Sequence, residues 1–220
     1  MLGECVMTET IEVTLFSFPE LSGEAKAKAR DWYRDDALDY DWHNFVYEDF
    51  EAICALIGVT LNTCTVRLMG GGTRQKPNIY FRGFWNQGDG ACFEGQYRYE
   101  KRAGKAIRAY APRDEMLHRI VDDLASIQRR NFYQLSADCR HRGHYYHEYC
   151  MLVGVHRDSA AGQDMTVDAE EAVKEALRDL ARWLYRQLER DYDYLNSDSA
   201  IDEAILANAC RFTEDGGFHD

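Results

Sequence analysis

Three histidines within seven residues form a candidate metal site. His141, His144 and His147 carry ring nitrogens, which hold zinc when they converge on one point at about 2.0–2.1 Å. We expect a strand over residues 144–156, and side chains three residues apart on a strand project from opposite faces. The three histidines are therefore predicted not to share a metal ion, and the chain is predicted to use no cofactor.

A run of glycines, Gly70-Gly71-Gly72, invites comparison with the loops that bind phosphate. Such a loop joins a strand to a helix and ends in Gly-Lys-Ser or Gly-Lys-Thr, so that backbone amides face the phosphate. This run leads toward a second predicted strand and lacks that ending, which favours a flexible connection. Because no familiar catalytic motif is present, the sequence favours a non-enzymatic protein. A small hydrolase or nucleotide-processing enzyme, built around the histidines and Asp89, stays an alternative.

The stretch from Gly83 to Gly95 is rich in glycines and aromatic residues. Its Asp89-Gly90 step is typical of a hairpin turn, which explains the glycines and Asp89 by structure alone. Trp85, Gln87 and Phe93 are less fully explained in this way. We hypothesise that Trp85, Gln87 and Asp89 form a recognition loop for a partner, with a plain hairpin as the alternative.

Acidic and aromatic residues are interleaved through residues 31–51. Such a surface imitates the phosphate track of nucleic acid and would meet a partner protein with a basic surface. The alternative is that these acids are the solvated faces and caps of two helices. The first hypothesis assigns partner binding to Asp35, Asp36, Asp39 and Asp41.

Charge is unevenly distributed along the chain, whose net charge is −12. Residues 1–60 and 156–220 are acidic, whereas residues 61–155 carry 15 bases and 9 acids. A basic centre between acidic ends indicates a surface for nucleic acid, although helices that solvate themselves with acids give the same distribution. For the nucleic-acid alternative the candidate residues are Arg67, Arg74, Arg98 and Arg102.

Composition indicates a cytoplasmic protein. The seven cysteines are odd in number and contain no Cys-x-x-Cys pair, which favours reduced thiols over a disulfide scaffold or zinc site. No apolar run approaches the roughly 18 residues that cross a bilayer, and the first residues lack the pattern of a secretory signal. We therefore expect no membrane partner.

Apolar spacing and runs of β-branched or aromatic residues predict the elements that position these residues. Helices are expected over about 22–38, 41–57, 113–130, 166–190 and 198–208. Strands are expected over about 10–18, 59–69, 78–84, 91–99, 132–140 and 144–156, with the second to fourth forming a meander. In a meander, the glycine run and Asp89 lie at opposite ends of the sheet and share no site.

This order of elements predicts an α+β fold. We expect a mainly antiparallel sheet of about five or six strands, helices packed on it, and a long C-terminal helix. Residues 1–156 are predicted to form the α+β core, with residues 157–220 as a helical extension packed on that core. The sequence leaves open whether the chain forms homo-oligomers.

Several segments together resemble a known group of proteins. They are Ala29–Arg34, Phe45–Asp49, Val66–Arg74, Gly83–Gly95, Asn131–Tyr133 and His141–Gly143. Over about residues 14–155 the chain resembles phage and prophage proteins labelled "antitoxin of toxin-antitoxin stability system". The resemblance implies a protein that binds and neutralises another protein, and it supplies no catalytic residues.

The leading hypothesis is therefore a non-enzymatic interaction protein of a phage or mobile element. It would act as an antitoxin-like or anti-defence inhibitor on a toxin or defence protein. The first alternative is a nucleic-acid-binding module that uses the central arginines, and the second is the small enzyme named above.

Overall fold

The computed structural model describes residues 12–36 and 41–219, which form two compact units. Unit 1 combines residues 1–42 with residues 192–220, and unit 2 is the continuous segment His43–Asp191. The predicted boundary at 156/157 lies inside unit 2. None of the helices that the structure describes is long and apolar enough to cross a membrane.

Unit 1 brings the two ends of the chain together around a small apolar core. Its three short strands pair antiparallel in the order β1-β10-β11, and Trp32 stacks on Phe218 with ring centroids 3.9 Å apart. The core consists of Phe18, Leu21, Ala25, Ala29, Ile201, Ile205 and Phe212. The elements are β1 (Phe16–Ser17), a 3-10 turn (Phe18–Glu20), α1 (Gly23–Asp36), α6 (Asp198–Ala207), β10 (Arg211–Phe212) and β11 (Phe218–His219).

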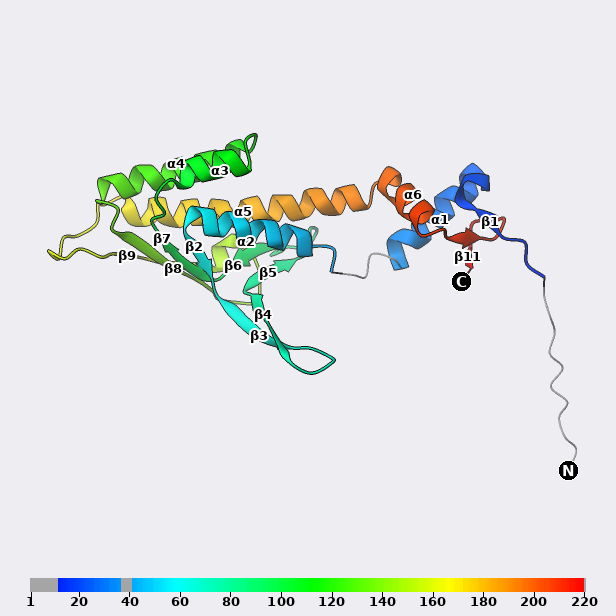
Figure 1. Ribbon diagram of the computed structural model, residues 1–220, viewed down its shortest axis with the longest axis horizontal. Coiled ribbons are helices and arrows are strands. Elements are labelled where there is room, and N and C mark those ends of the chain that lie inside the picture. Colours follow the sequence, from blue (N-terminus) through cyan, green and yellow to red (C-terminus); the bar gives the residue numbers. More distant parts are fainter. Residues whose placement is uncertain (1–11, 37–40, 220) are drawn as a thin grey trace, which may run out of the picture. The chain divides into compact units, whose positions relative to one another are not determined.

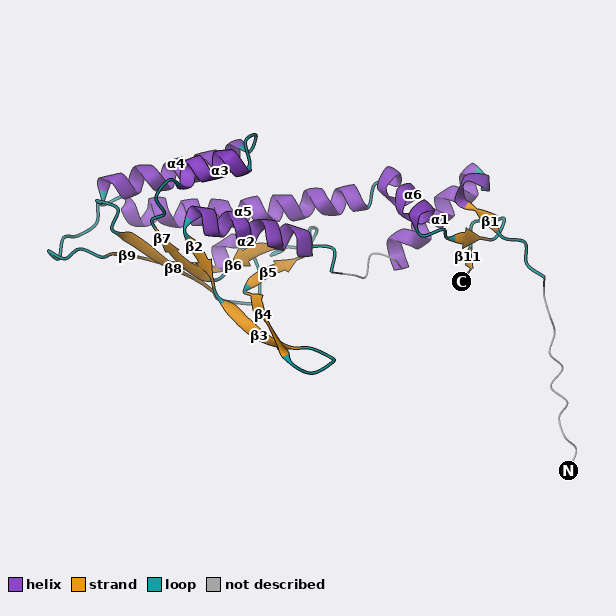
Figure 2. Cartoon of the chain, in the orientation of Figure 1, coloured by secondary structure: helices purple, strands orange, loops and turns teal. Residues whose placement is uncertain are grey.

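Unit 2 is built on a four-stranded antiparallel sheet in the order β2-β7-β8-β9. Side chains alternate between buried and exposed along β9, as expected for a sheet that is covered on one face. Figures 1 and 2 show the helices of this unit gathered on one side of the sheet. The strands are β2 (Val59–Leu61), β7 (Gly95–Arg98), β8 (Leu135–His141) and β9 (Met151–Arg157). The helices are α2 (Asn44–Ile57), α3 (Ala103–Tyr110), α4 (Glu115–Arg130) and α5 (Ala169–Leu195), whose last four residues belong to unit 1.

Two further hairpins branch from this sheet at a three-way junction. Strand β3 (Thr63–Arg67) pairs with β4 (Thr73–Pro77), and β5 (Ile79–Arg82) pairs with β6 (Gly90–Phe93). The Asn62 amide donates to the Glu94 carbonyl (2.9 Å), the Glu94 amide to the Asn78 carbonyl (2.9 Å), and the Asn78 amide to the Asn62 carbonyl (2.7 Å). These three bonds close a ring, so each chain segment exchanges one partner strand for another without leaving its backbone groups unpaired.

The Glu94 carboxylate holds the junction together through its side chain. One oxygen accepts from the Asn78 side-chain amide at 2.7 Å, and the other accepts from the His141 backbone amide at 3.0 Å. The junction is thereby tied to the end of β8.

The predicted α+β class is confirmed, with antiparallel strands and a long helix toward the C-terminus. One pairing of the predicted meander is confirmed, because β5 pairs with β6. The other is wrong, because residues 59–69 leave β7 at Asn62 and pair with the unpredicted strand β4. The strand expected over 144–156 begins only at Met151, since residues 148–150 form a 3-10 turn. Helix α3 and the C-terminal strands were not predicted, and residues 10–11 of the first predicted strand lie outside the described residues.

Candidate functional site

The β3–β4 hairpin, residues 63–77, is the most exposed element of unit 2, and we call it the arm. Every residue from 63 to 76 is exposed, and Pro77 at its base is half-buried. Figure 1 shows the arm in cyan, extending away from the four-stranded sheet. An isolated two-stranded ribbon gains little stability in water, so burial of side chains does not explain why the arm is present.

The arm carries positive charge on both of its faces. It contains Arg67, Arg74 and Lys76, and no acidic residue lies between positions 63 and 77. Arg74 lies opposite Val66, and Lys76 opposite Cys64, so these two cations share one face. Arg67 projects from the other face, where the Gln75 side chain donates to the Thr65 hydroxyl at 3.0 Å.

The tip of the arm is apolar and is turned by glycines. The Gly71 amide donates to the Leu68 carbonyl at 3.1 Å, and the Leu68 amide donates to the Gly72 carbonyl at 3.2 Å. Gly71 and Gly72 have φ angles of 83° and 93°, the left-handed region that glycine adopts without steric cost. The turn leaves Leu68 and Met69 exposed to solvent.

A groove of about 450 Å³ lies at the base of the arm. Thr63 and Pro77 of the arm line it together with β2, the end of α2, Arg98 and Tyr99. Burial raises the pKa of the Glu51 carboxyl in this groove, the neighbouring Glu48 adds to the rise, and the positive charge of Arg74 opposes it. The groove thus joins the arm to Arg98, and two carboxyl residues, Glu51 and Glu100, line it as well.

Arg102 lines a second, smaller cavity of about 170 Å³ between β7 and helices α3 and α4. Tyr99 and Glu100 line both cavities. The four arginines of the nucleic-acid alternative therefore fall into two groups, with Arg67 and Arg74 on the arm and Arg98 and Arg102 at adjoining cavities. Lys76 belongs with the first group, and sequence reasoning missed it because the strand β4 was not predicted.

The loop between β5 and β6 is shaped by Asp89. One carboxylate oxygen of Asp89 accepts from the backbone amides of Trp85 (3.0 Å) and Asn86 (2.7 Å). Gln87 is exposed, and 75% of Trp85 is accessible to solvent. Within the predicted recognition loop, Asp89 therefore has an internal role in the turn, while Trp85 and Gln87 face solvent. Phe93 is fully buried in β6, so it is a core residue and not part of an exposed loop.

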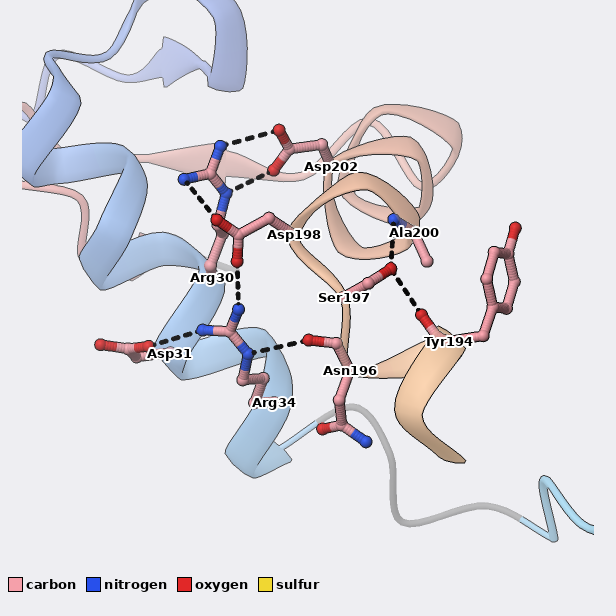
Figure 3. A network of polar contacts seen from close by, with 9 residues as sticks. All are labelled: Arg30, Asp31, Arg34, Tyr194, Asn196, Ser197, Asp198, Ala200 and Asp202. Atoms are coloured by element: carbon pink, nitrogen blue, oxygen red, sulfur yellow. Dashed lines mark hydrogen bonds and ion pairs between the residues drawn. The ribbon is translucent and has the colours of Figure 1, made fainter. Parts of the chain in front are cut away.

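Several acids of α1 and α6 form ion pairs inside unit 1 (Figure 3). Asp202 accepts two hydrogen bonds from Arg30 at 2.6 and 2.8 Å, and Arg34 contacts Asp31 at 2.8 Å and Asp198 at 2.5 Å. The hydrogen bonds from Arg30 lower the pKa of Asp202. These acids neutralise internal cations and so contribute less negative charge to a binding surface.

Only part of the predicted acidic site can be placed. Asp35 and Asp41 are exposed. Asp39 and the side chain of Asp36 lie outside the described residues.

The histidine cluster is arranged differently from the prediction. His141 is the last residue of β8 and its ring Nε2 lies 3.0 Å from the Tyr145 carbonyl oxygen, whereas His144 and His147 precede the 3-10 turn and not a strand. Strand alternation therefore does not separate His144 from His147. Among the described residues, no group of three His, Cys, Asp or Glu side chains is placed to hold a metal ion.

The buried cysteines have the properties of structural thiols. Burial raises the pKa of Cys92 and of Cys139 to about 12, and it raises the pKa of Cys54 well above its usual value. A thiol with such a pKa stays protonated at neutral pH and is a poor nucleophile.

The fold and the arm define the chain as an α+β protein with a projecting, basic two-stranded ribbon. Residues 42–198 match the family described as "Domain of unknown function (DUF8835)", and the chain belongs to this family. The matched residues contain all of unit 2, including the arm and both cavities. No curated protein and no solved structure matches the chain.

Proposed function

We propose that this protein binds nucleic acid and that the arm is its main contact with the phosphate backbone. The observation that carries the proposal is the exposed ribbon with Arg67 on one face, Arg74 and Lys76 on the other, and no acid among its residues. Arginine and lysine bind phosphates by charge and hydrogen bonding, whatever the base sequence. A ribbon with cations on both faces can contact phosphates on either side of itself.

The distribution of charge between the two units supports this proposal. Between His43 and Asp191 the sequence holds 21 basic and 21 acidic residues, so the net charge of −12 comes entirely from unit 1. The unit that carries the arm is therefore neutral as a whole, and its local potential depends on where the cations gather. Three of them lie on the arm, where no acid accompanies them, whereas the groove at the arm's base combines Arg98 with Glu51 and Glu100.

The test compares two variants that lose the same charge. The arm variant combines Arg67→Gln, Arg74→Gln and Lys76→Gln. The control variant combines Lys105→Gln, Arg113→Gln and Arg119→Gln, which remove three exposed cations from α3, α4 and the loop between them. Binding of labelled 20-nucleotide single strands and 20-base-pair duplexes is measured by fluorescence anisotropy at several salt concentrations.

We expect the arm variant to lose at least tenfold in affinity for the probes that the wild type binds. The slope of log K against log salt should become shallower by about 2 to 3, since each lost phosphate contact removes about 0.7–0.9 from the slope. The control variant should retain most of the affinity. Equal losses in both variants, or a wild type that binds none of the probes, would contradict the proposal.

A second candidate function is the binding of a protein partner. The observation that favours it is Trp85, because exposed tryptophans are over-represented among the residues that dominate protein interfaces. In this proposal the chain is an antitoxin-like or anti-defence inhibitor from a phage or mobile element. Trp85, Gln87, Asp35 and Asp41 would contact a toxin or defence protein with a basic surface.

This second proposal is tested with Trp85→Ala and the arm variant side by side. A host protein that co-purifies with the wild type and with the arm variant, but not with Trp85→Ala, would support it. A partner that is retained by Trp85→Ala would exclude the loop as the contact.

A further inference from the structure

Two consecutive aromatic residues after α4 adopt a backbone conformation that favours glycine. Phe132 and Tyr133 have φ angles of 56° and 60°. Side chains other than glycine, and to a lesser degree asparagine, are disfavoured in this left-handed region. Both side chains are nevertheless large and exposed, with 69% of Phe132 and 47% of Tyr133 accessible to solvent. The strain therefore does not serve to bury either ring.

Two fully buried amide side chains hold this strained segment. Gln128 donates to the Leu135 carbonyl at 2.8 Å and accepts from the Leu135 amide at 3.1 Å. Asn131 donates to the Ile127 carbonyl and the Thr166 hydroxyl, each at 3.0 Å, and accepts from the Thr166 amide at 2.9 Å. The Phe132–Tyr133 segment is thus fixed on both sides by bonds within the core.

Each of the two exposed rings packs beside one further group, Tyr133 beside the ring of Tyr99 and Phe132 beside the guanidinium of Arg157. We call the three aromatic residues Tyr99, Phe132 and Tyr133 the platform. The rings of Tyr99 and Tyr133 are 4.5 Å apart and tilted by 37°. The Arg157 guanidinium lies 5.6 Å from the centre of the Phe132 ring, and Gln134 orients it by accepting a hydrogen bond at 3.1 Å. The position of each platform ring is therefore set by its neighbours, as a preformed binding surface requires.

Exposed cations stand close to the platform residues in the sequence, and one platform residue, Tyr99, lines the groove of the arm. These exposed cations are Arg98, Lys101, Arg102, Arg129 and Arg130. Glu100 and Asp168, the ion-pair partner of Arg130, are acids near this group. Tyr99 belongs both to the platform and to the groove whose other end is formed by Thr63 and Pro77 of the arm.

We propose that the platform stacks against unpaired nucleobases, so that the nucleic acid bound by this protein is single-stranded. The inference rests on the proposed function and specifies its ligand. Bases within a duplex already stack on one another, whereas the bases of a single strand are free to stack on aromatic rings and guanidinium groups. The cations around the rings then contact the phosphates of the same strand, and the groove leads that strand toward the arm.

The test uses oligonucleotides that differ only in their bases. One probe is a labelled 12-nucleotide single strand, and the other has the same sugar-phosphate backbone with abasic positions at its centre. The two have equal backbone charge, so the ratio of their affinities reports stacking and not phosphate contact. We expect the wild type to bind the complete strand at least tenfold more tightly, since stacking is worth this much or more per base.

The platform variant combines Phe132→Gly and Tyr133→Gly, which remove the rings and suit the left-handed backbone. It should bind both probes with similar affinity while melting within a few degrees of the wild type. Phe132→Asn alone removes only the more exposed ring and should lower the ratio at least threefold. Phe132→Tyr combined with Tyr133→Phe keeps both rings and should keep the ratio.

The outcomes separate this inference from the proposed function. The arm variant should bind both probes more weakly and still discriminate between them. A wild type that binds both probes equally, or a platform variant that keeps the full ratio, would overturn the platform and leave phosphate binding by the arm in place. A wild type that binds neither probe would overturn both, and the platform would then be tested as a protein contact.

Discussion

Replacing Gln128 with methionine removes one of the two buried amides that fix the end of α4. In the wild type the Gln128 side chain bonds to both backbone groups of Leu135, and it lies 3.3 Å from the Tyr97 hydroxyl. Leu135 is almost completely buried, so water does not replace these bonds in the variant. The change therefore leaves two buried backbone groups without partners at the start of β8.

The size of the effect follows from these contacts. Each buried polar group that loses its partner costs about 1–3 kcal/mol. Methionine has a similar volume, and its additional apolar burial returns about 1 kcal/mol. With two such groups, we therefore expect the free energy of unfolding to fall by about 1–5 kcal/mol. The matched control is Gln75→Met on the arm, where the same exchange removes one exposed bond to Thr65 and should cost less than about 0.5 kcal/mol.

Urea unfolding of both variants measures the loss, and hydrogen exchange locates it. The Leu135 amide should be protected in the wild type and in Gln75→Met, and should exchange much faster in Gln128→Met. A loss below about 1 kcal/mol, with the Leu135 amide still protected, would refute the reasoning. It would mean that the backbone finds new partners and that Gln128 does not hold the strained segment.

Three further predictions concern pH, thiol reactivity and a tight turn. The hydrogen bonds from Arg30 lower the pKa of Asp202, so this ion pair stabilises the folded protein above the ordinary carboxyl pKa of 3.8. The free energy of unfolding, measured as a function of pH, should show that contribution being lost below that pH. Asp202→Asn has no carboxylate to titrate at this position, so its free energy of unfolding should fall by less over the same range. Among the cysteines that the structure describes, Cys64 on the exposed arm should be labelled first by a maleimide reagent at pH 7.5, and bound oligonucleotide should slow this labelling if the arm is the contact. The slowest thiols should be Cys54, Cys92 and Cys139. Gly58→Ala should lower the free energy of unfolding in a urea titration by at least about 2 kcal/mol, because φ is 93° and a Cβ atom would lie 2.2 Å from a backbone oxygen. The control is Gly23→Ala, where a Cβ atom would meet open space and the free energy of unfolding should hardly change.

The helices were predictable because their apolar residues repeat with helical spacing. In α4, the residues expected to face inward were Met116, Leu117, Ile120, Val121, Leu124 and Ile127. All of them are buried except Met116, which is half-buried. Helix α3 was missed because it has only eight residues and a single fully buried side chain, Ile107, which gives too short a pattern to recognise.

Strand pairing was less predictable than the strands themselves. Residues 59–69 read as one β-rich run, and nothing in that run marks Asn62 as the point where the partner strand changes. The change depends on backbone bonds to residues 78 and 94, which local sequence does not encode. The arm was missed for the same reason, although two of its cations, Arg67 and Arg74, were among the arginines named as nucleic-acid candidates in the basic centre.

The platform was not predictable from residue types either. A helix usually ends at glycine or asparagine in the left-handed conformation, and here Phe132 and Tyr133 take that conformation after Asn131. Only the buried partners of Asn131 and Gln128 explain why the backbone accepts them, and those partners come from distant positions such as Thr166.

The ring of three hydrogen bonds at Asn62, Asn78 and Glu94 makes the length of the arm independent of the strand register in the rest of unit 2. Because the ring closes below the first pair of the arm, Thr63 and Pro77, equal insertions in β3 and β4 change no other register. Each added pair of residues would lengthen the arm by about 3.3 Å. Relatives can therefore adjust the reach and the charge of this element to different ligands, while the core of unit 2 keeps one architecture.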